Sequence, residues 1–260
     1  MESNAIDLGT PFGTEAYLTK GESSLSPSLR ASLPASPPAY EMKFVLTPDQ
    51  ADEVLTWVGR RLAPDPHGDP RLQGAYHTTT LYLDTVAEDV RNRRGWHRRR
   101  KLRVRRYGEA NWVFIEKKAK RVGQVSKERS RVSLSELDLL SGPVDLSWPG
   151  AWFGDIAGLR GLCPSALVSY ERFAFLSPSA YGSVRLTIDR NLACVRASGW
   201  SFAIDDTPMP FLVGSVLLEL KFQTALPAMF KDLIAERRLT PRPASKYRLG
   251  RAVLDGGVDA

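Results

Sequence analysis

Cysteine and histidine are scarce in this sequence of 260 residues. It contains two cysteines, Cys163 and Cys194, and three histidines. The cysteines lie far apart with no C-x-x-C spacing, and the histidines form no cluster, so the usual thiolate and imidazole ligands of a zinc site are missing. We therefore expect any metal ion to be bound by carboxylate oxygens.

Long hydrophobic runs are also missing. No apolar stretch approaches the roughly 18 residues that a membrane-spanning helix needs. The first residues, Met1 to Asn4, are polar and lead into no apolar segment, so no secretory signal is visible. The sequence therefore predicts a cytoplasmic protein without a membrane span. The 43% of apolar residues suffice for a sizeable core, which excludes a fully disordered chain.

Positive charge is abundant and unevenly spread. The chain has 36 Lys and Arg against 29 Asp and Glu, a net charge of +7. Residues 91–131 alone carry 17 Lys and Arg against three Glu, so this window is +14 and the rest of the chain sums to −7. Such a surplus indicates an anionic partner: nucleic acid, a membrane surface or a polyanionic small molecule.

The chain divides into an arm, a folded domain and a short tail. Residues 1–39 are rich in serine and proline and show no helical or strand period, which predicts a disordered arm. The folded domain is expected over residues 40–254, and residues 255–260 form a flexible tail. Thr47, Pro48 and Gln50 make a capping-box start for a helix. Further helices are expected over residues 227–238 and after Ser245, with short helical stretches at 135–140 and 152–159.

Most of the remaining sequence alternates with a period of two. The expected strands cover residues 79–84, 102–107, 112–118, 125–132, 170–176, 183–189, 201–205 and 216–222. We therefore predict an α+β fold dominated by antiparallel sheet.

Several of these strands carry charge on one face. Lys101, Arg103 and Arg105 share a face opposite Leu102 and Val104. The same alternation recurs at Glu41 and Lys43, at Glu116 and Lys118, at Lys127, Arg129 and Arg131, at Arg185 and Asp189, and at Glu219 and Lys221. The ordinary interpretation is that each charged face is solvent-exposed. The alternative is a closed barrel whose charged faces converge on a lumen, which would suit a chain of phosphates.

These charged strands contain motifs that occur in a characteristic order. They are Tyr40–Phe44, Leu81–Thr85, Lys101–Gly108, Phe114–Lys118, Val125–Arg129, Tyr170–Arg172, Val184–Asp189, Leu217–Phe222 and Ser245–Tyr247. Together they resemble the VTC domain of polyphosphate polymerases, in the triphosphate tunnel metalloenzyme superfamily. The resemblance covers residues 40–254.

The resemblance implies a fold and a site. The fold is a closed antiparallel tunnel of about eight strands with a basic lumen, flanked by several helices. Phosphates would be bound by Lys43, Arg103, Arg105, Lys118, Lys127, Arg172, Arg185 and Lys246, and the catalytic set would be Arg103, Arg105, Lys118, Arg172, Arg185 and Glu219. Glu219 would bind a divalent cation, manganese or magnesium. Glu116 and Glu41 are weaker candidates for the metal, because they share strand faces with cations.

The activity implied by the resemblance is ATP-dependent synthesis of inorganic polyphosphate. The superfamily motif E-x-E-x-K reads here as Ala39-Tyr40-Glu41-Met42-Lys43, so its first glutamate is absent. This departure favours the polymerase branch over the hydrolases and cyclases. The alternatives are an inorganic or nucleoside triphosphatase, and a non-catalytic sensor of polyphosphate or inositol phosphates. ATP and polyphosphate are the expected partners and nucleic acid is not favoured, while a protein partner or a second copy of the chain stays open.

The arginine run before the strand at 102–107 has two interpretations. Arg91, Arg93, Arg94 and Arg98 to Arg100 form a solvated loop in the ordinary interpretation. The alternative is an exit path for a phosphate chain or a patch that binds RNA.

Overall fold

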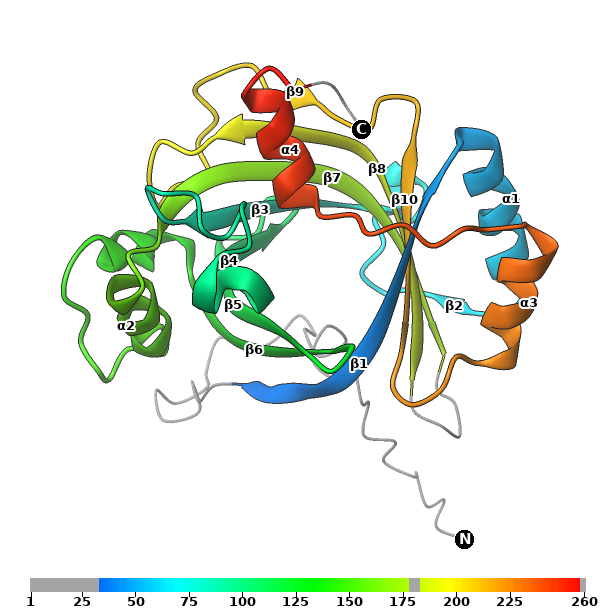
Figure 1. Ribbon diagram of the computed structural model, residues 1–260, viewed down its shortest axis with the longest axis horizontal. Helices are drawn as coiled ribbons and strands as arrows, with labels where there is room; N and C mark the ends of the chain where they lie inside the picture. Colours follow the sequence, from blue (N-terminus) through cyan, green and yellow to red (C-terminus); the bar gives the residue numbers. More distant parts are fainter. Residues whose placement is uncertain (1–32, 178–182, 258–260) are drawn as a thin grey trace, which may run out of the picture.

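A closed antiparallel β-barrel forms the centre of the molecule (Figure 1). The computed structural model describes residues 33–177 and 183–257. The sheet order is β2-β7-β3-β4-β5-β6-β1-β10-β8-β9, and an additional pairing of β7 with β8 closes a ring. In this described part, eight strands make the ring and the two-residue strands β2 and β9 are appended to it. The expected closed antiparallel barrel within an α+β fold is confirmed.

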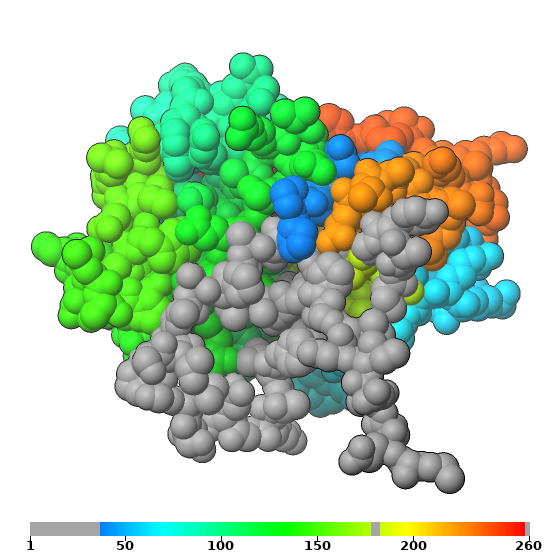
Figure 2. All heavy atoms as spheres, turned by 90° about the horizontal axis from the view of Figure 1, so that it is seen from below, coloured from blue at the N-terminus to red at the C-terminus, as the bar shows by residue number. Residues whose placement is uncertain are grey.

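The strands that close the barrel are long. They are β1 (Leu33–Leu46), β3 (Tyr76–Asp84), β4 (Arg100–Tyr107), β5 (Trp112–Arg121), β6 (Gln124–Ser133), β7 (Cys163–Ser177), β8 (Val184–Arg196) and β10 (Val216–Phe222). The short strands are β2 (Ala63–Pro64) and β9 (Met209–Pro210). Figure 2 shows β1 between the β5–β6 hairpin and β10, in agreement with its pairing to both neighbours.

Two sequence predictions differ from the structure. The expected disordered arm ended at residue 39, but β1 begins at Leu33, because residues 33–40 pair with β6. The rest of that arm, residues 1–32, lies outside the described residues. The expected strand at 201–205 is wrong. Phe202 packs partly against the core, but its neighbours are exposed and the described pairings give this segment no partner strand.

Two helices cover one side of the barrel. Helix α1 (Pro48–Val58) begins with the expected capping box, in which Thr47 Oγ1 accepts from the Gln50 backbone N–H and Gln50 Oε1 accepts from the Thr47 N–H. Helix α3 (Ala228–Glu236) lies beside α1 in Figure 1. Both pack on the outward apolar faces of β1, β8 and β10, where Phe44, Leu186 and Leu218 are fully buried. The charged faces of these three strands therefore point into the barrel.

A second group of helices covers the opposite side and one end. Helix α2 (Ala151–Leu159) and the 3-10 helix η4 (Leu134–Ser141) lie outside β5 and β6 (Figure 1). Helix α4 (Lys246–Leu254) lies across β7 and β8, with Ser245 as its N-cap. The remaining helical turns are η2 (Pro70–Leu72) and η3 (Gly95–Arg99). Among the helices in residues 33–177 and 183–257, none combines the length and apolar character needed to cross a membrane.

Candidate phosphate-binding site

A cavity of about 420 Å³ lies at the end of the barrel where β3 ends and β4 begins. Its lining is dominated by Lys and Arg from strands β1, β4, β5, β7 and β10, from the segment before β4 and from the start of α4. They are Lys43, Arg93, Arg98, Arg99, Arg100, Lys101, Arg103, Arg105, Lys118, Lys120, Arg172, Lys221, Arg242, Lys246 and Arg248. The acidic residues in the lining are Glu41 and Glu219. We call this cavity the basic pocket.

The two carboxylates of the basic pocket lie on adjacent strands and are both paired with lysines. Glu219 Oε2 lies 3.1 Å from Lys43 Nζ, and Glu219 Oε1 lies 3.3 Å from Lys221 Nζ. Lys118 Nζ donates to both carboxylate oxygens of Glu41, at 3.0 and 2.7 Å. Strand register explains the Lys43–Glu219 pair and a further contact of 3.5 Å between Lys221 Nζ and Glu41 Oε1, because β1 and β10 place these residues opposite each other.

These lysines keep both carboxylates ionised. Burial and the proximity of Glu219 would raise the pKa of Glu41, but Lys118 and Lys221 outweigh them and lower it to about 2. Burial opposes ionisation of Glu219 as well, yet Lys43 and Lys221 hold the pKa of that carboxyl well below its usual range. The pocket therefore presents two negatively charged oxygen ligands among its cations.

A second cluster lies deeper, on β4, β5 and β6. Glu116 is fully buried, and its Oε2 accepts from Arg103 Nε at 2.7 Å. Its other oxygen lies 3.5 Å from Lys127 Nζ. Burial would raise the pKa of Glu116, but Arg103 and Lys127 hold it well below its usual range. Of the three residues, Arg103 lines the basic pocket, so Glu116 acts as the acid that orients Arg103.

A third cluster fixes two cations from β7 and α4. Arg172 donates to Asp189 through Nε at 2.7 Å and through Nη2 at 2.9 Å. Lys246 Nζ lies 2.5 Å from the same carboxylate, and Asp189 is completely buried. Burial would raise the pKa of Asp189, but Arg172 and Lys246 lower it to about 2. One buried carboxylate thus holds two pocket cations in place.

Arg105 and Tyr170 lie beside this cluster. Arg105 is buried and donates from Nε to Thr80 Oγ1 at 3.3 Å. Tyr170 is buried with Arg172 and Lys246 over its ring, at 5.1 and 4.7 Å from the centroid. No described residue hydrogen-bonds to its hydroxyl. Burial opposes ionisation of Tyr170, but Arg105 and Arg172 lower the pKa of its phenol overall.

The structure brings most of the predicted site residues together. Those that line the basic pocket are Lys43, Arg103, Arg105, Lys118, Arg172, Lys246 and Glu219. Lys127, Arg185 and Glu116 do not line it. Arg185 points toward the other end of the barrel, where its Nη2 donates to Asp65 at 3.0 Å and to the Tyr76 hydroxyl at 2.9 Å. Arg185 therefore does not line the basic pocket, and the phosphate-binding role expected for it stays a prediction.

Sequence reasoning left several pocket residues out of the site. Lys101 and Lys221 line the pocket, and both follow the same alternation as the predicted residues, so strand period alone could have added them. Asp189 also follows this alternation, and the structure pairs it with Arg172. Of the arginine run, Arg93 and Arg98 to Arg100 are exposed and also line the pocket. They are therefore solvent-exposed, as in the ordinary interpretation, while the exit path and the RNA patch stay predictions.

The residues of the pocket fit a divalent cation of the magnesium type. The described residues contain no group of three or more His, Cys, Asp and Glu side chains suited to a metal. Magnesium and manganese, however, need only one or two protein carboxylates when phosphate oxygens and water complete their shell. Glu219 and Glu41 offer such oxygens on the pocket wall, whereas Glu116 is outside the lining. Glu219 with Glu41 therefore makes a better carboxylate pair than Glu219 with Glu116.

Lys101 should make binding of a polyanion depend on pH. Its Nζ donates to Ser245 Oγ at 2.7 Å, and burial together with Lys43 and Lys118 lowers its pKa to about 7. A bound triphosphate stabilises the ammonium form and so raises this pKa. Because the neutral lysine must take up a proton to bind well, we expect ATP affinity to fall by up to tenfold per pH unit between pH 7 and 8.5. Titration calorimetry in two buffers measures the proton uptake that accompanies binding.

Two variants test this prediction: Lys101→Arg, and Lys117→Arg as a control on the outer face of β5. Lys101→Arg keeps the charge at all these pH values, so the pH dependence should become shallower, with the remainder contributed by Lys118, whose pKa is lowered to about 8 mainly by burial. Lys117 pairs with Glu128 and lies outside the pocket lining, so Lys117→Arg should leave proton uptake unchanged. Equal proton uptake in wild type and Lys101→Arg would contradict the assignment.

Comparison with known proteins agrees with this architecture. No curated protein is significantly similar to the sequence. Among solved structures, a proposed adenylate cyclase from Bacillus halodurans matches with a TM-score of 0.52 at 11% identity, over 82% of this chain and 96% of that one. A proposed adenylyl cyclase from Hippeastrum with a dominant triphosphatase activity matches with a TM-score of 0.45 at 14% identity, over 85% of this chain and 97% of that one. The first likeness shows the shared barrel fold. The family model of the VTC domain matches residues 38–255, and the chain belongs to this family.

Proposed function

We propose that this chain is an ATP-dependent, metal-requiring polyphosphate polymerase. The observation that carries the proposal is the basic pocket, in which cations from five strands and α4 surround the carboxylates of Glu41 and Glu219. A triphosphate carries about four negative charges, and transfer of its terminal phosphoryl group depends mainly on positioning and charge neutralisation. The pocket provides for both needs.

The reaction needs no protein base. A terminal oxygen of the polyphosphate chain, already ionised at neutral pH, attacks the γ-phosphorus of ATP. A new P–O bond forms to the chain, the bond between the γ-phosphorus and the β,γ-bridging oxygen breaks, and ADP leaves with the electron pair. The chain grows by one phosphate and no proton has to be removed from the acceptor, in contrast to a hydroxyl or water nucleophile.

The pocket residues bind and orient the phosphates. Arg172 and Lys246, held by Asp189, and Arg103, held by Glu116, present their remaining N–H groups to phosphate oxygens from fixed positions. Glu219 and Glu41 would bind the divalent cation, which supplies charge neutralisation at the bridging and terminal oxygens. Lys43 and Lys118 must then exchange part of their contact with these carboxylates for contact with phosphate.

The products of ATP turnover test the proposal. The purified chain is incubated with ATP and manganese or magnesium, with and without a short polyphosphate primer, and the phosphate products are separated on a gel. We expect a ladder of polyphosphate chains that disappears with EDTA. Lys118→Gln should weaken the ladder and Lys117→Gln, on the outer face of the same strand, should not. Absence of any chain under all these conditions would overturn the polymerase.

The second candidate is a triphosphatase on the same scaffold. The observation that favours it is the pair Glu41 and Glu219, because a carboxylate facing the phosphates can place or activate an attacking water. In the same experiment a triphosphatase releases only free phosphate. Tight triphosphate binding without any turnover would instead indicate a sensor.

A further inference from the structure

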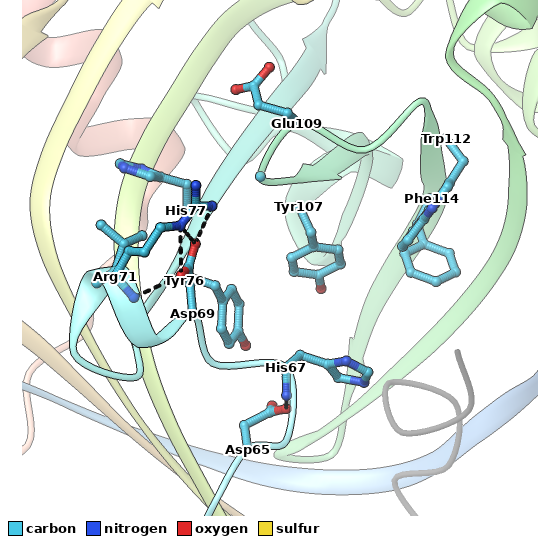
Figure 3. A pocket seen from close by; sticks show the side chains of 12 residues that line it. Asp65, His67, Asp69, Arg71, Tyr76, His77, Tyr107, Glu109, Trp112 and Phe114 are labelled. Carbon is cyan, nitrogen blue, oxygen red and sulfur yellow. Dashed lines mark hydrogen bonds and ion pairs between the residues drawn. The ribbon is translucent and has the colours of Figure 1, made fainter. Parts of the chain in front are cut away.

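A second cavity, of about 400 Å³, lies at the opposite end of the barrel from the basic pocket. It is formed where β3 begins, β4 ends and β5 begins, together with the loop that follows β2 (Figure 3). Aromatic rings from the three strands, Tyr76, Tyr107, Trp112 and Phe114, line it. We call this cavity the aromatic pocket.

The rings form a continuous cluster with Tyr107 in its middle. The Tyr107 ring lies 5.8 Å from Tyr76 and 6.1 Å from Phe114, edge to face in both cases, and Phe114 lies 5.2 Å from Trp112. Figure 3 shows the Tyr76 and Tyr107 rings pointing into the same space, with the imidazole of His67 at its lower side. A planar ligand group could therefore pack against several ring faces and edges of this cluster.

The aromatic pocket lacks the surplus of positive charge that distinguishes the basic pocket. Its lining includes Asp65, Asp69 and Glu109, and its arginine, Arg71, is bound by Asp69 through both carboxylate oxygens. Asp65 is buried and accepts from Arg185. Glu109 in turn lies 3.4 Å from Arg106, so each of these acids has an arginine partner. A chain of phosphates would therefore gain little at this end and be attracted at the other. The barrel is thus polarised along its length.

The linings of the two pockets come close together along β4. Strand β4 carries Arg103, Arg105 and Tyr107 on one face, at intervals of about 6–7 Å. Arg103 and Arg105 line the basic pocket and Tyr107 lines the aromatic pocket, with the Arg105 guanidinium 6.0 Å from the Tyr107 ring centre. A ligand that places its phosphates beside Arg105 would therefore have aromatic rings within reach of its other end, starting with Tyr107 two residues further along β4.

We propose that the aromatic pocket binds the nucleoside part of the nucleotide substrate. This inference rests on the proposed function, because it assumes that a nucleoside triphosphate occupies the barrel. The nucleotide then lies along the barrel axis, with its base among Tyr107, Tyr76 and Phe114 and its terminal phosphate toward Glu219. The growing polyphosphate chain extends from the terminal phosphate out through the basic pocket. The orientation follows from chemistry: a base has a planar face for aromatic stacking, and its amino and ribose hydroxyl groups can donate to acidic side chains.

The experiment compares ATP with inorganic triphosphate, which has the phosphates but no nucleoside. Binding of both is measured by titration calorimetry for wild type, Tyr107→Leu and Tyr107→Phe. We expect wild type to prefer ATP. Tyr107→Leu should weaken ATP about tenfold and leave inorganic triphosphate within about twofold, and Tyr107→Phe should restore ATP binding because it keeps the ring. The matched control is Tyr40→Leu, since Tyr40 is also half-buried but stacks on Phe222 and lines neither pocket.

Each failure has a distinct meaning. If Tyr107→Leu weakens ATP and inorganic triphosphate equally, or weakens neither, the nucleoside site is overturned while the phosphate site stands. If wild type binds inorganic triphosphate as tightly as ATP, the same conclusion holds. If wild type binds neither compound, the proposed function fails and the nucleoside site fails with it.

Photolabelling gives a second readout that does not depend on a variant folding. Wild type is irradiated with 2-azido-ATP, whose reactive group is on the base, and the labelled peptides are identified by mass spectrometry. We expect label in the segment 107–114 or at Tyr76, reduced by excess ATP. Label confined to residues 93–101 or 241–248, which line the basic pocket, would overturn the proposed orientation.

Discussion

Glu219→Gln is expected to lower ATP turnover by about a hundredfold or more, because it removes the best-placed carboxylate for the metal from the centre of the basic pocket. The same substitution removes one negative charge that now neutralises Lys43 and Lys221. In the presence of EDTA the variant should therefore bind a triphosphate more tightly than wild type. Steady-state turnover of ATP and metal-free binding are the two measurements.

The opposite signs of the two effects make the prediction specific. A misfolded variant would lose binding together with turnover. A Glu219 that only balances the charge of Lys43 and Lys221, without binding metal, would leave turnover nearly unchanged when it is replaced. The control is Glu53→Gln, since Glu53 pairs with Arg237 on the outside of α1 and should change neither quantity. Reduced metal-free binding in Glu219→Gln would contradict the role assigned to this carboxylate.

Strand alternation made much of the barrel predictable from the sequence. A residue such as Lys43 or Arg103 reveals its face by the apolar residues on either side, and burial of Phe44 and Leu102 confirms those faces. The ordered motifs then indicated how such strands assemble. What alternation cannot give is which side chains meet across strands, because that depends on register and twist. Lys118 meets Glu41 from a strand 77 residues away, and nothing local marks that pair.

The missed parts of the site have a common physical origin. Arg185 is basic and lies on an inward face like the others, but the turn carrying Asp65 brings an acid beside it at the far end of the barrel. The aromatic pocket likewise joins Tyr76 to Tyr107 and Trp112, which lie at the ends of two strands expected from the sequence. Their convergence depends on β3, β4 and β5 being neighbours in the closed sheet, which the sequence of any one strand does not encode.

Asp189→Asn is expected to destabilise the fold by about 3–5 kcal/mol, because it leaves Arg172 and Lys246 buried without their counter-charge. The pH dependence has a definite sign. The pKa of Asp189 is about 2 in the folded chain, below the value of about 3.9 for an unfolded aspartate. Its stabilisation is therefore complete above about pH 4 and is lost as the pH falls toward 2. Denaturant unfolding of wild type and variant between pH 3 and 7 measures both effects.

The matched control for Asp189 is Asp52, an exposed aspartate that pairs with Arg190 of β8. Arg190 Nη2 lies 2.5 Å from Asp52 Oδ1, a distance as short as any in the Asp189 cluster, but the Asp52 side chain is 67% exposed. Water screens this pair and already solvates the carboxylate, so Asp52→Asn should cost about 1 kcal/mol or less. If the two substitutions cost the same, burial does not make Asp189 the anchor of the pocket cations. If they differ as expected, Asp189 holds Arg172 and Lys246 in place before a phosphate binds. Phosphate binding then does not have to order these two side chains, and their conformational entropy does not reduce the affinity.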